Sequence, residues 1–317
     1  RSRGLGDVYK RQVYGQILRD TASVNLVKQG VDNIYNLRFD VAREAVRKLE
    51  ESWPEHPVLY LMNGMITYWE NYPLLPSSSE SRSYETDMRS CINASEKYTG
   101  DTDKAEYLLA NLGASGMLLL FYADNKLSDN VFPLARKTYR HIRQAFDYTS
   151  YYPDFLFFTG LYNYYREAYP DVHPVYKVLA LFFPKGDRVR GLTEMQKAAE
   201  MSIMLKAESS SFLSHIWSSF ENNHTKAYTY SNYLHEQYPA NLQYLAAHIR
   251  NALLIKRYGE AEELLRLSGN STGNPYFEAQ RMIFKGIIRE KKYHDYKSAR
   301  TYYHSGISGI LSHGSYG

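Results

Sequence analysis

The sequence of 317 residues lacks the features that mark several common classes of protein. It contains one cysteine, Cys91, so it can form neither an intrachain disulfide nor a metal site built from cysteines alone. A lone cysteine in a helical context is usually a small buried apolar group. The most apolar stretch, residues 155–183, is interrupted by charged residues and prolines, so it cannot supply the roughly 20 uncharged residues that cross a bilayer. We therefore expect no transmembrane segment.

An excess of charge of one sign is also missing. The formal net charge is +4, and residues 1–12 carry most of it, which leaves the remainder of the chain close to neutral. Proteins that bind nucleic acid concentrate lysine and arginine on one face, and this balance gives no sign of such a face. We therefore expect no nucleic-acid partner.

The two ends of the chain differ from the rest. Residues 1–12 have no apolar periodicity and resemble the translated adapter sequence found on metagenomic gene fragments, so we treat residues 1–15 as an artefactual or disordered leader. The small Gly15 before Gln16 would suit a signal-peptidase site, which favours an exported or periplasmic bacterial protein over a cytoplasmic one. An ordinary frayed terminus is the alternative. Residues 312–317 are expected to be a frayed tail, with a truncated gene as the alternative.

Signals for β-strands are scarce. The sequence has no Asn-Gly or Asp-Gly turn and no sustained alternation of apolar and polar residues. Apolar residues instead recur at the i, i+3, i+4 spacing of a helix face almost throughout the chain. These patterns predict an all-α protein, a class in which internal repeats of 20 to 50 residues are common.

A repeat is visible in the spacing of small residues. Ala42 is followed by Pro54 twelve residues later, Ala261 lies 34 residues after Ala227, and Ala299 lies a further 38 residues on. This pattern resembles the tetratricopeptide-repeat (TPR) family, in which small residues let two helices pack closely and a proline ends the second helix. The resemblance implies a right-handed superhelix, or α-solenoid, of helical hairpins.

The resemblance extends over most of one expected domain, residues 16–311. It is clearest in the repeats 22–56, 208–240, 241–275 and 276–311. Longer loops in the middle units and the absence of the usual tryptophan in the first helix of each unit depart from the family pattern. About seven hairpins are expected, at residues 20–53, 57–98, 104–150, 153–205, 208–238, 241–268 and 275–311.

One segment predicts local structure in more detail. Residues 186–192 resemble a Gly-Asp-Arg-x-x-Gly-Leu segment of some divergent TPR-like proteins. Asp187 is expected to cap the following helix, and Gly191 to let that helix approach its neighbour closely. Gly160 is the expected small residue of the preceding helix. The segment lacks the spacing of a phosphate-binding loop.

Catalytic and metal-binding patterns are weak. His235 and Glu236 begin like a zinc-protease helix, but Pro239 stands where the second histidine must lie. Acidic clusters such as residues 260–263 are typical of solvated salt bridges, and the serine clusters lack a nucleophile-elbow pattern. We therefore expect no catalytic residue, no metal and no cofactor. Three N-glycosylation sequons are present, at Asn93, Asn223 and Asn270, and we interpret them as chance occurrences.

Tyrosine is unusually abundant, with 31 residues. Tyrosine rings pack between helices, and they are also enriched in binding surfaces. In the TPR family the concave groove is lined from the first helix of each repeat, and the aligned register places four residues of this chain there, with Tyr165 beside one of them. The expected partner-binding residues are Tyr164, Tyr165, Phe212, Gln243 and Arg250.

These patterns predict a non-catalytic scaffold whose concave groove binds a protein or peptide partner. One alternative is a structural or glycan-binding component of a bacterial cell-envelope assembly, with a glycan as ligand. A third and less favoured interpretation is an α-helical glycan-processing enzyme, which needs two carboxylates across the groove. The expected register places no acidic residue at the groove-facing positions.

Overall fold

The computed structural model of the protein describes residues 17–100, 104–172, 183–269 and 273–312. Over these ranges the chain forms fourteen α-helices and no β-strand, which confirms the all-α class. Several predictions lie outside the described residues. They are the leader at 1–15, the site at Gly15 and Gln16, the sequon at Asn270 and the tail after residue 312.

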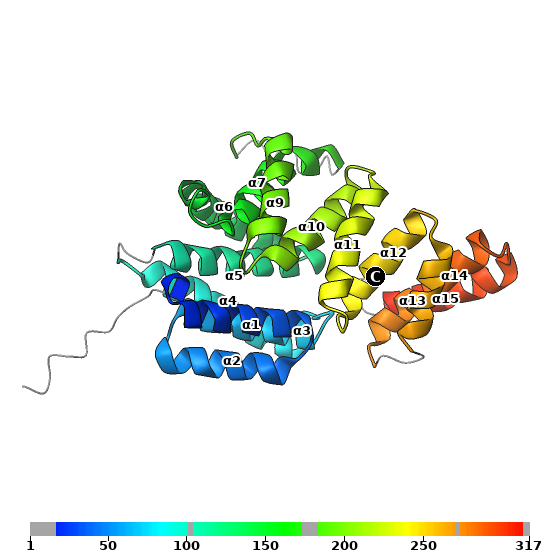
Figure 1. The fold of residues 1–317 in the computed structure, drawn as a ribbon, viewed down its shortest axis with the longest axis horizontal. Coiled ribbons are helices and arrows are strands. Elements are labelled where there is room, and N and C mark those ends of the chain that lie inside the picture. The colour runs from blue at the N-terminus through cyan, green and yellow to red at the C-terminus, as the bar shows by residue number, and fades with distance from the viewer. Residues whose placement is uncertain (1–16, 101–103, 173–182, 270–272, 313–317) are drawn as a thin grey trace, which may run out of the picture.

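The helices follow one another as antiparallel neighbours, and each of the seven expected hairpin ranges contains two of them (Figure 1). Residues 173–182, between α7 and α9, are not described. The helices are α1 (Thr21–Tyr35), α2 (Phe39–Ser52), α3 (Pro57–Glu70), α4 (Ser79–Lys97), α5 (Lys104–Asp124), α6 (Ser128–Ala145), α7 (Phe155–Val172), α9 (Arg188–Met201), α10 (Lys206–Ser219), α11 (His224–Gln237), α12 (Leu242–Leu254), α13 (Tyr258–Leu267), α14 (Pro275–Lys291) and α15 (Tyr296–Leu311).

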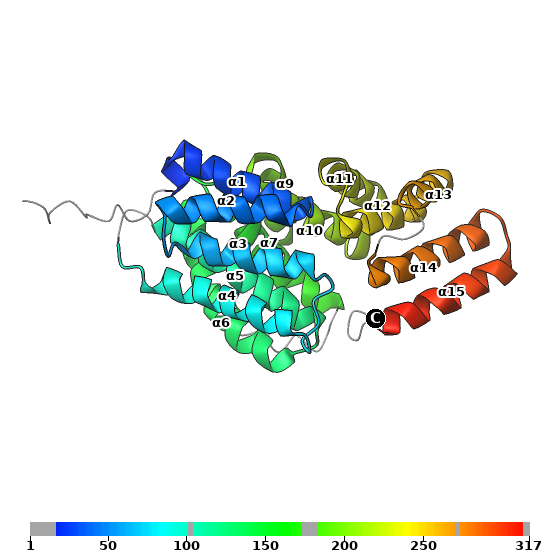
Figure 2. The ribbon, with the colours of Figure 1, turned by 90° about the horizontal axis from the view of Figure 1, so that it is seen from below.

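The array of helices bends back on itself. Figure 1 shows α6, α7 and α9 on the opposite side of α5 from α1 to α3, and Figure 2 shows the first hairpins layered over one another. The first helices of the first five pairs, together with a short 3-10 helix at Ile17–Arg19, line a common cavity of about 60 Å³. These five helices, α1, α3, α5, α7 and α10, are therefore the inner helices of this part of the array.

The pair α7 and α9 shows how sequence sets the packing distance. The Asp187 side chain caps α9 by accepting a hydrogen bond from the backbone N–H of Arg190 at 2.9 Å, as predicted. A Cβ atom on Gly191 would lie 2.5 Å from the backbone nitrogen of Tyr164 and 2.8 Å from the carbonyl oxygen of Gly160. Only glycine allows so close an approach, which confirms the predicted role of Gly191.

The helix α5 forms the centre of the core. By length and composition alone it is apolar enough to cross a membrane, although 67% of its apolar window is buried in the protein. Our membrane prediction considered residues 155–183 and did not anticipate this segment. Packing of α3, α4 and α6 around α5 accounts for its apolar character. Cys91 of α4 is also fully buried against α5, as expected for a lone cysteine.

Candidate functional site

Arg250 on α12 is a cation that has no counterion among the described residues. Its side chain is exposed to solvent. Desolvation by the surrounding protein nevertheless lowers its pKa, and the neighbouring Tyr276 and Tyr72 raise that pKa to a smaller extent. In the part of the chain that the structure describes, Arg250 makes no hydrogen bond or ion pair. It is therefore available to an anion from outside the protein.

His215 on α10 lies close to this arginine. Its ring is also exposed, and its pKa is lowered by burial and further by the positive charge of Arg250. The ring meets Phe220 edge-on, with centroids 5.7 Å apart. An imidazole beside an unpaired guanidinium adds a second donor for an anionic group.

Aromatic rings continue the surface toward α7. The ring of Tyr165 lies 5.4 Å from Phe220 and 6.4 Å from Phe212, both in edge-to-face geometry. Phe212 in turn lies 5.5 Å from Phe157, which is buried. Tyr165 and Phe212 are half-buried, so each ring is held by the core while part of it faces solvent. Such rings present rigid apolar contact area to a partner.

Two further tyrosines act on Arg250: Tyr276 at the start of α14, which is buried, and Tyr72 just after α3. The two rings lie 6.3 Å apart. Burial raises the pKa of Asp124, at the end of α5, to about 6, and the charge of Asp124 acts on Tyr276. We call the following set the inner surface: Tyr72, Asp124, Tyr165, Phe212, His215, Arg250 and Tyr276.

Three of the five predicted partner-binding residues, Tyr165, Phe212 and Arg250, belong to the inner surface. Gln243 is half-buried in the first turn of α12, two turns and roughly 10 Å before Arg250.

The prediction for Tyr164 was wrong. Its ring is fully buried, and its hydroxyl donates to Glu221 Oε1 at 2.6 Å. Tyr164 lies one turn after Gly160, so it shares the helix face that packs against α9. The next residue, Tyr165, points about 100° further around the helix and reaches the inner surface.

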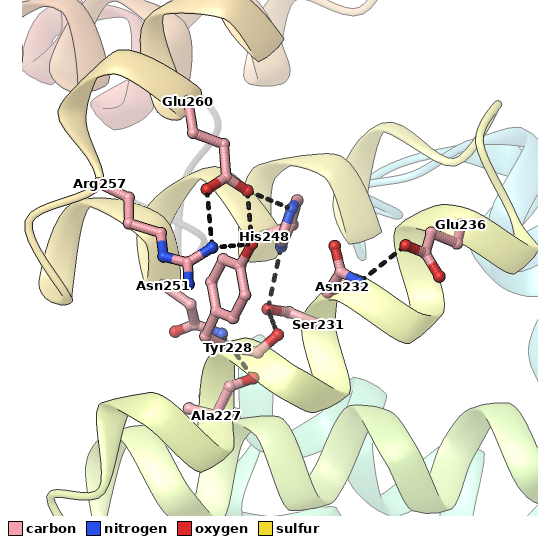
Figure 3. Close-up of polar contacts among 9 residues, drawn as sticks. All are labelled: Ala227, Tyr228, Ser231, Asn232, Glu236, His248, Asn251, Arg257 and Glu260. Carbon is pink, nitrogen blue, oxygen red and sulfur yellow. Dashed lines mark hydrogen bonds and ion pairs between the residues drawn. The ribbon is translucent and has the colours of Figure 1, made fainter.

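A polar network, buried at Ser231, His248 and Asn251 and exposed at Arg257, joins α12 to α11 and α13 (Figure 3). Glu260 Oε1 accepts a hydrogen bond from the Tyr228 hydroxyl at 2.6 Å and lies 3.4 Å from His248 Nε2. The guanidinium of Arg257 donates to the Tyr228 hydroxyl at 3.0 Å and to the second carboxylate oxygen at 3.3 Å. Asn251 donates to the carbonyl oxygen of Ala227 at 3.2 Å. These contacts fix α12, and with it Arg250, against α11 and α13.

Ser231, His248 and Glu260 lie in the order of a Ser-His-acid catalytic triad, but the serine is not placed to act as a nucleophile. Ser231 Oγ lies 3.4 Å from His248 Nδ1, but the serine hydroxyl donates to the carbonyl oxygen of Tyr228 at 3.0 Å. Both Ser231 and His248 are buried, so a substrate has no access to the oxygen. The network is a structural support for α12.

Metal binding and paired-carboxylate chemistry find no support in the described ranges. No three His, Cys, Asp or Glu residues there gather in a way that holds a metal ion. Asp124 is an acidic residue that the sequence register did not place on the inner surface. Glycoside hydrolysis requires two carboxyl groups, and the set defined as the inner surface includes one, Asp124.

The buried His248 makes stability depend on pH. Burial, and then the neighbouring His235, lower the pKa of His248 from 6.5 to about 4. Between these values the unfolded chain binds a proton that the folded chain does not, so stability falls as pH decreases. The contribution of this residue to the free energy of unfolding should drop by about 3 kcal/mol between pH 7 and pH 4.

Urea denaturation of the wild type and of His248→Gln at a series of pH values checks this. We expect the stability difference between the two proteins to change in favour of the variant as pH falls below 6.5. Parallel pH profiles for the two proteins would contradict a neutral buried imidazole.

Comparisons of the chain with protein-family models, with curated proteins and with solved structures give no match.

Proposed function

We propose that the protein is a non-catalytic interaction scaffold whose inner surface binds an acidic segment of a partner protein. The observation that carries this proposal is the unpaired, desolvated guanidinium of Arg250 between aromatic side chains. A carboxylate paired with this partly desolvated arginine gains more than it would beside a fully solvated one, because less solvent screens the pair. The rings of Tyr165 and Phe212 supply apolar contact beside it.

The finer architecture belongs to the same proposal. We infer that the seven hairpins form a right-handed TPR-like α-solenoid, a form that presents an extended concave surface. The consecutive pairing of helices and the close approach at Gly191 support this inference. The proposal includes no catalytic step, no metal and no cofactor, and it places the protein in an exported or periplasmic setting.

The test uses displayed random peptides, because the partner is not identified. We expect the selected segments to be rich in Asp and Glu, and to bind Arg250→Gln at least tenfold more weakly than the wild type in calorimetric titrations. Raising the salt concentration should weaken wild-type binding.

The matched control is Arg266→Gln, since Arg266 lies on α13 and is exposed and paired with Glu263 at 2.5 Å. This variant should bind like the wild type. Equal affinity of Arg250→Gln and wild type, with unchanged helical signal, would remove the basis of the proposal.

A glycan ligand is the second candidate, favoured by the half-exposed rings of Tyr165 and Phe212, because aromatic faces stack on sugars. A structural role in a bacterial envelope assembly is compatible with the same surface. Glycan binding that depends on Tyr165 and is insensitive to Arg250→Gln would favour this candidate over a protein partner.

A further inference from the structure

The first hairpin returns to the fifth and sixth hairpins through Tyr35, at the end of α1. The Tyr35 hydroxyl donates to Glu208 Oε1 of α10, and its carbonyl oxygen accepts from Asn241 Nδ2 at 3.0 Å. Its ring packs edge-on against Tyr238, with centroids 5.5 Å apart. The Tyr238 hydroxyl also donates to Asp32 Oδ1 at 3.2 Å. We call these residues the closing contact: Asp32, Tyr35, Glu208, Tyr238 and Asn241.

The closing contact contains two carboxyl groups and no cation. The pKa of Glu208 is raised to about 8, mainly because the carboxyl group is buried. A hydrogen bond from the backbone N–H of Glu208 lowers this pKa, and the negative charge of Asp32 raises it. The other groups that face Glu208 are tyrosines, Tyr35 from α1, Tyr238 after α11 and Tyr244 from α12. In the part of the chain that the structure describes, no lysine or arginine pairs with Glu208. Ionised Glu208 therefore has no positive charge to offset it.

The remaining neighbours of Glu208 do not supply one either. Glu208 lines the central cavity of about 60 Å³, whose other titratable lining residues are His56 and Glu106. His56 Nε2 lies 3.6 Å from Glu106 Oε1, so the imidazole is already directed at an acid. Glu208 Oε2 is buried and has no hydrogen-bond partner among the described residues. The bond from the Tyr35 hydroxyl favours the ionised carboxylate, but one neutral donor does not offset the burial of a charge beside Asp32 while α1 stays packed against α10.

A row of rings joins the closing contact to the inner surface. The Tyr35 ring lies 5.6 Å from Trp69, which stacks on Tyr72 at 5.7 Å. Tyr72 belongs to the inner surface and contacts Tyr276 beside Arg250. Separation of α1 from α10 therefore removes the support on one side of the partner-binding residues.

We propose that the closing contact is a proton-dependent closure, in which neutral Glu208 holds α1 against α10 to α12 and ionised Glu208 releases it. The effect on partner binding rests on the proposed function of the inner surface. The closure itself can be measured on the protein alone, with no partner present.

The sign follows from linkage. The pKa of Glu208 is about 8 in the closed form, compared with 4.5 for a free glutamate, so the open form loses its proton first as pH rises. The closed form is favoured below pH 4.5, and the equilibrium constant for opening should grow by up to about tenfold per pH unit until pH 8.

Hydrogen exchange of the backbone amides at the end of α1, followed by mass spectrometry at pH 5.5 and pH 7.5, tests the closure. After correction for the intrinsic exchange rates, we expect protection in the wild type to fall by about 100-fold between these two values. Glu208→Gln, which cannot ionise, should keep the same protection at both. Glu263→Gln on α13 is the matched control and should behave like the wild type.

Equal protection of the wild type at pH 5.5 and 7.5 would overturn the proposal, and so would an identical loss in Glu208→Gln. If Glu208→Gln fails to fold, the wild-type measurement still decides. Loss of peptide binding at Arg250 leaves these results unaffected, because no peptide is present. Failure of the closure and failure of the proposed function are therefore distinguishable.

Discussion

Gly191→Ala should lower the free energy of unfolding by about 3 kcal/mol, and by more if the helices cannot separate. The new Cβ atom would meet backbone atoms on α7, the nitrogen of Tyr164 at 2.5 Å and the carbonyl oxygen of Gly160 at 2.8 Å. Backbone atoms cannot rotate away as a side chain can. The pair α7 and α9 must therefore move apart and lose packing along its length.

The control is a second helical glycine. Gly259 lies on α13, and a Cβ atom there would meet nothing within 4 Å. Gly259→Ala should raise stability by about 0.5 to 1 kcal/mol, since alanine has the higher helix propensity. Chemical denaturation of both variants gives the comparison. A Gly191→Ala midpoint equal to that of the wild type would show that the two helices are not held in contact here.

Asp154→Ala is expected to have the second large effect, a loss of about 4 kcal/mol. The Asp154 carboxylate is 4% exposed and accepts three backbone hydrogen bonds from the segment that joins α9 to α10. The donors are the N–H groups of Ile203 at 3.1 Å, Met204 at 2.8 Å and Leu205 at 3.0 Å. Alanine leaves these donors without their acceptor in a partly buried position.

Two variants calibrate this result by chemical denaturation. Asp154→Asn retains Oδ1, the acceptor for Met204 and Leu205, so it should lose less than alanine does. Asp187→Ala removes an ordinary helix cap with a single backbone bond and should cost about 1 kcal/mol. Equal losses for Asp154→Ala and Asp187→Ala would show that the three-fold acceptor has no special role.

The helical hairpins could be predicted because their signals are local. Asp187 and Gly191 lie within five residues of each other, and a cap and a close helix contact are properties of one or two turns. The recurrence of small residues such as Ala42, Ala227 and Ala261, each fully buried, marks the same position in the first, fifth and sixth pairs. Such patterns need no knowledge of how the pairs are placed in space.

The inner surface was only partly predictable. Arg250 and Phe212 follow from a register counted along single helices. Asp124 and Tyr72 lie at or just beyond the ends of helices, where a register from a repeat pattern no longer applies. The error at Tyr164 has the same origin, because one residue of register moves a side chain by about 100° around the helix.

The closing contact could not be predicted from sequence. Tyr35 and Glu208 are 173 residues apart, and each lies in a segment whose local pattern is that of an ordinary helix. Their contact depends on the summed rotation of all the intervening pairs. Small differences in each pair accumulate, so a single sequence does not determine which distant helices meet.

The return of α1 to α10 restricts how this protein can vary in length. An open array tolerates the gain or loss of a unit, because each unit touches only its neighbours. Here the first five pairs form a circuit closed by Tyr35, Glu208 and Asn241. Deleting any pair between α3 and α9 would break that circuit. The start of α14 also returns to the end of α3, where Asn274 donates to the carbonyl oxygen of Tyr72 at 2.9 Å. The number of hairpins between these contacts is thus fixed.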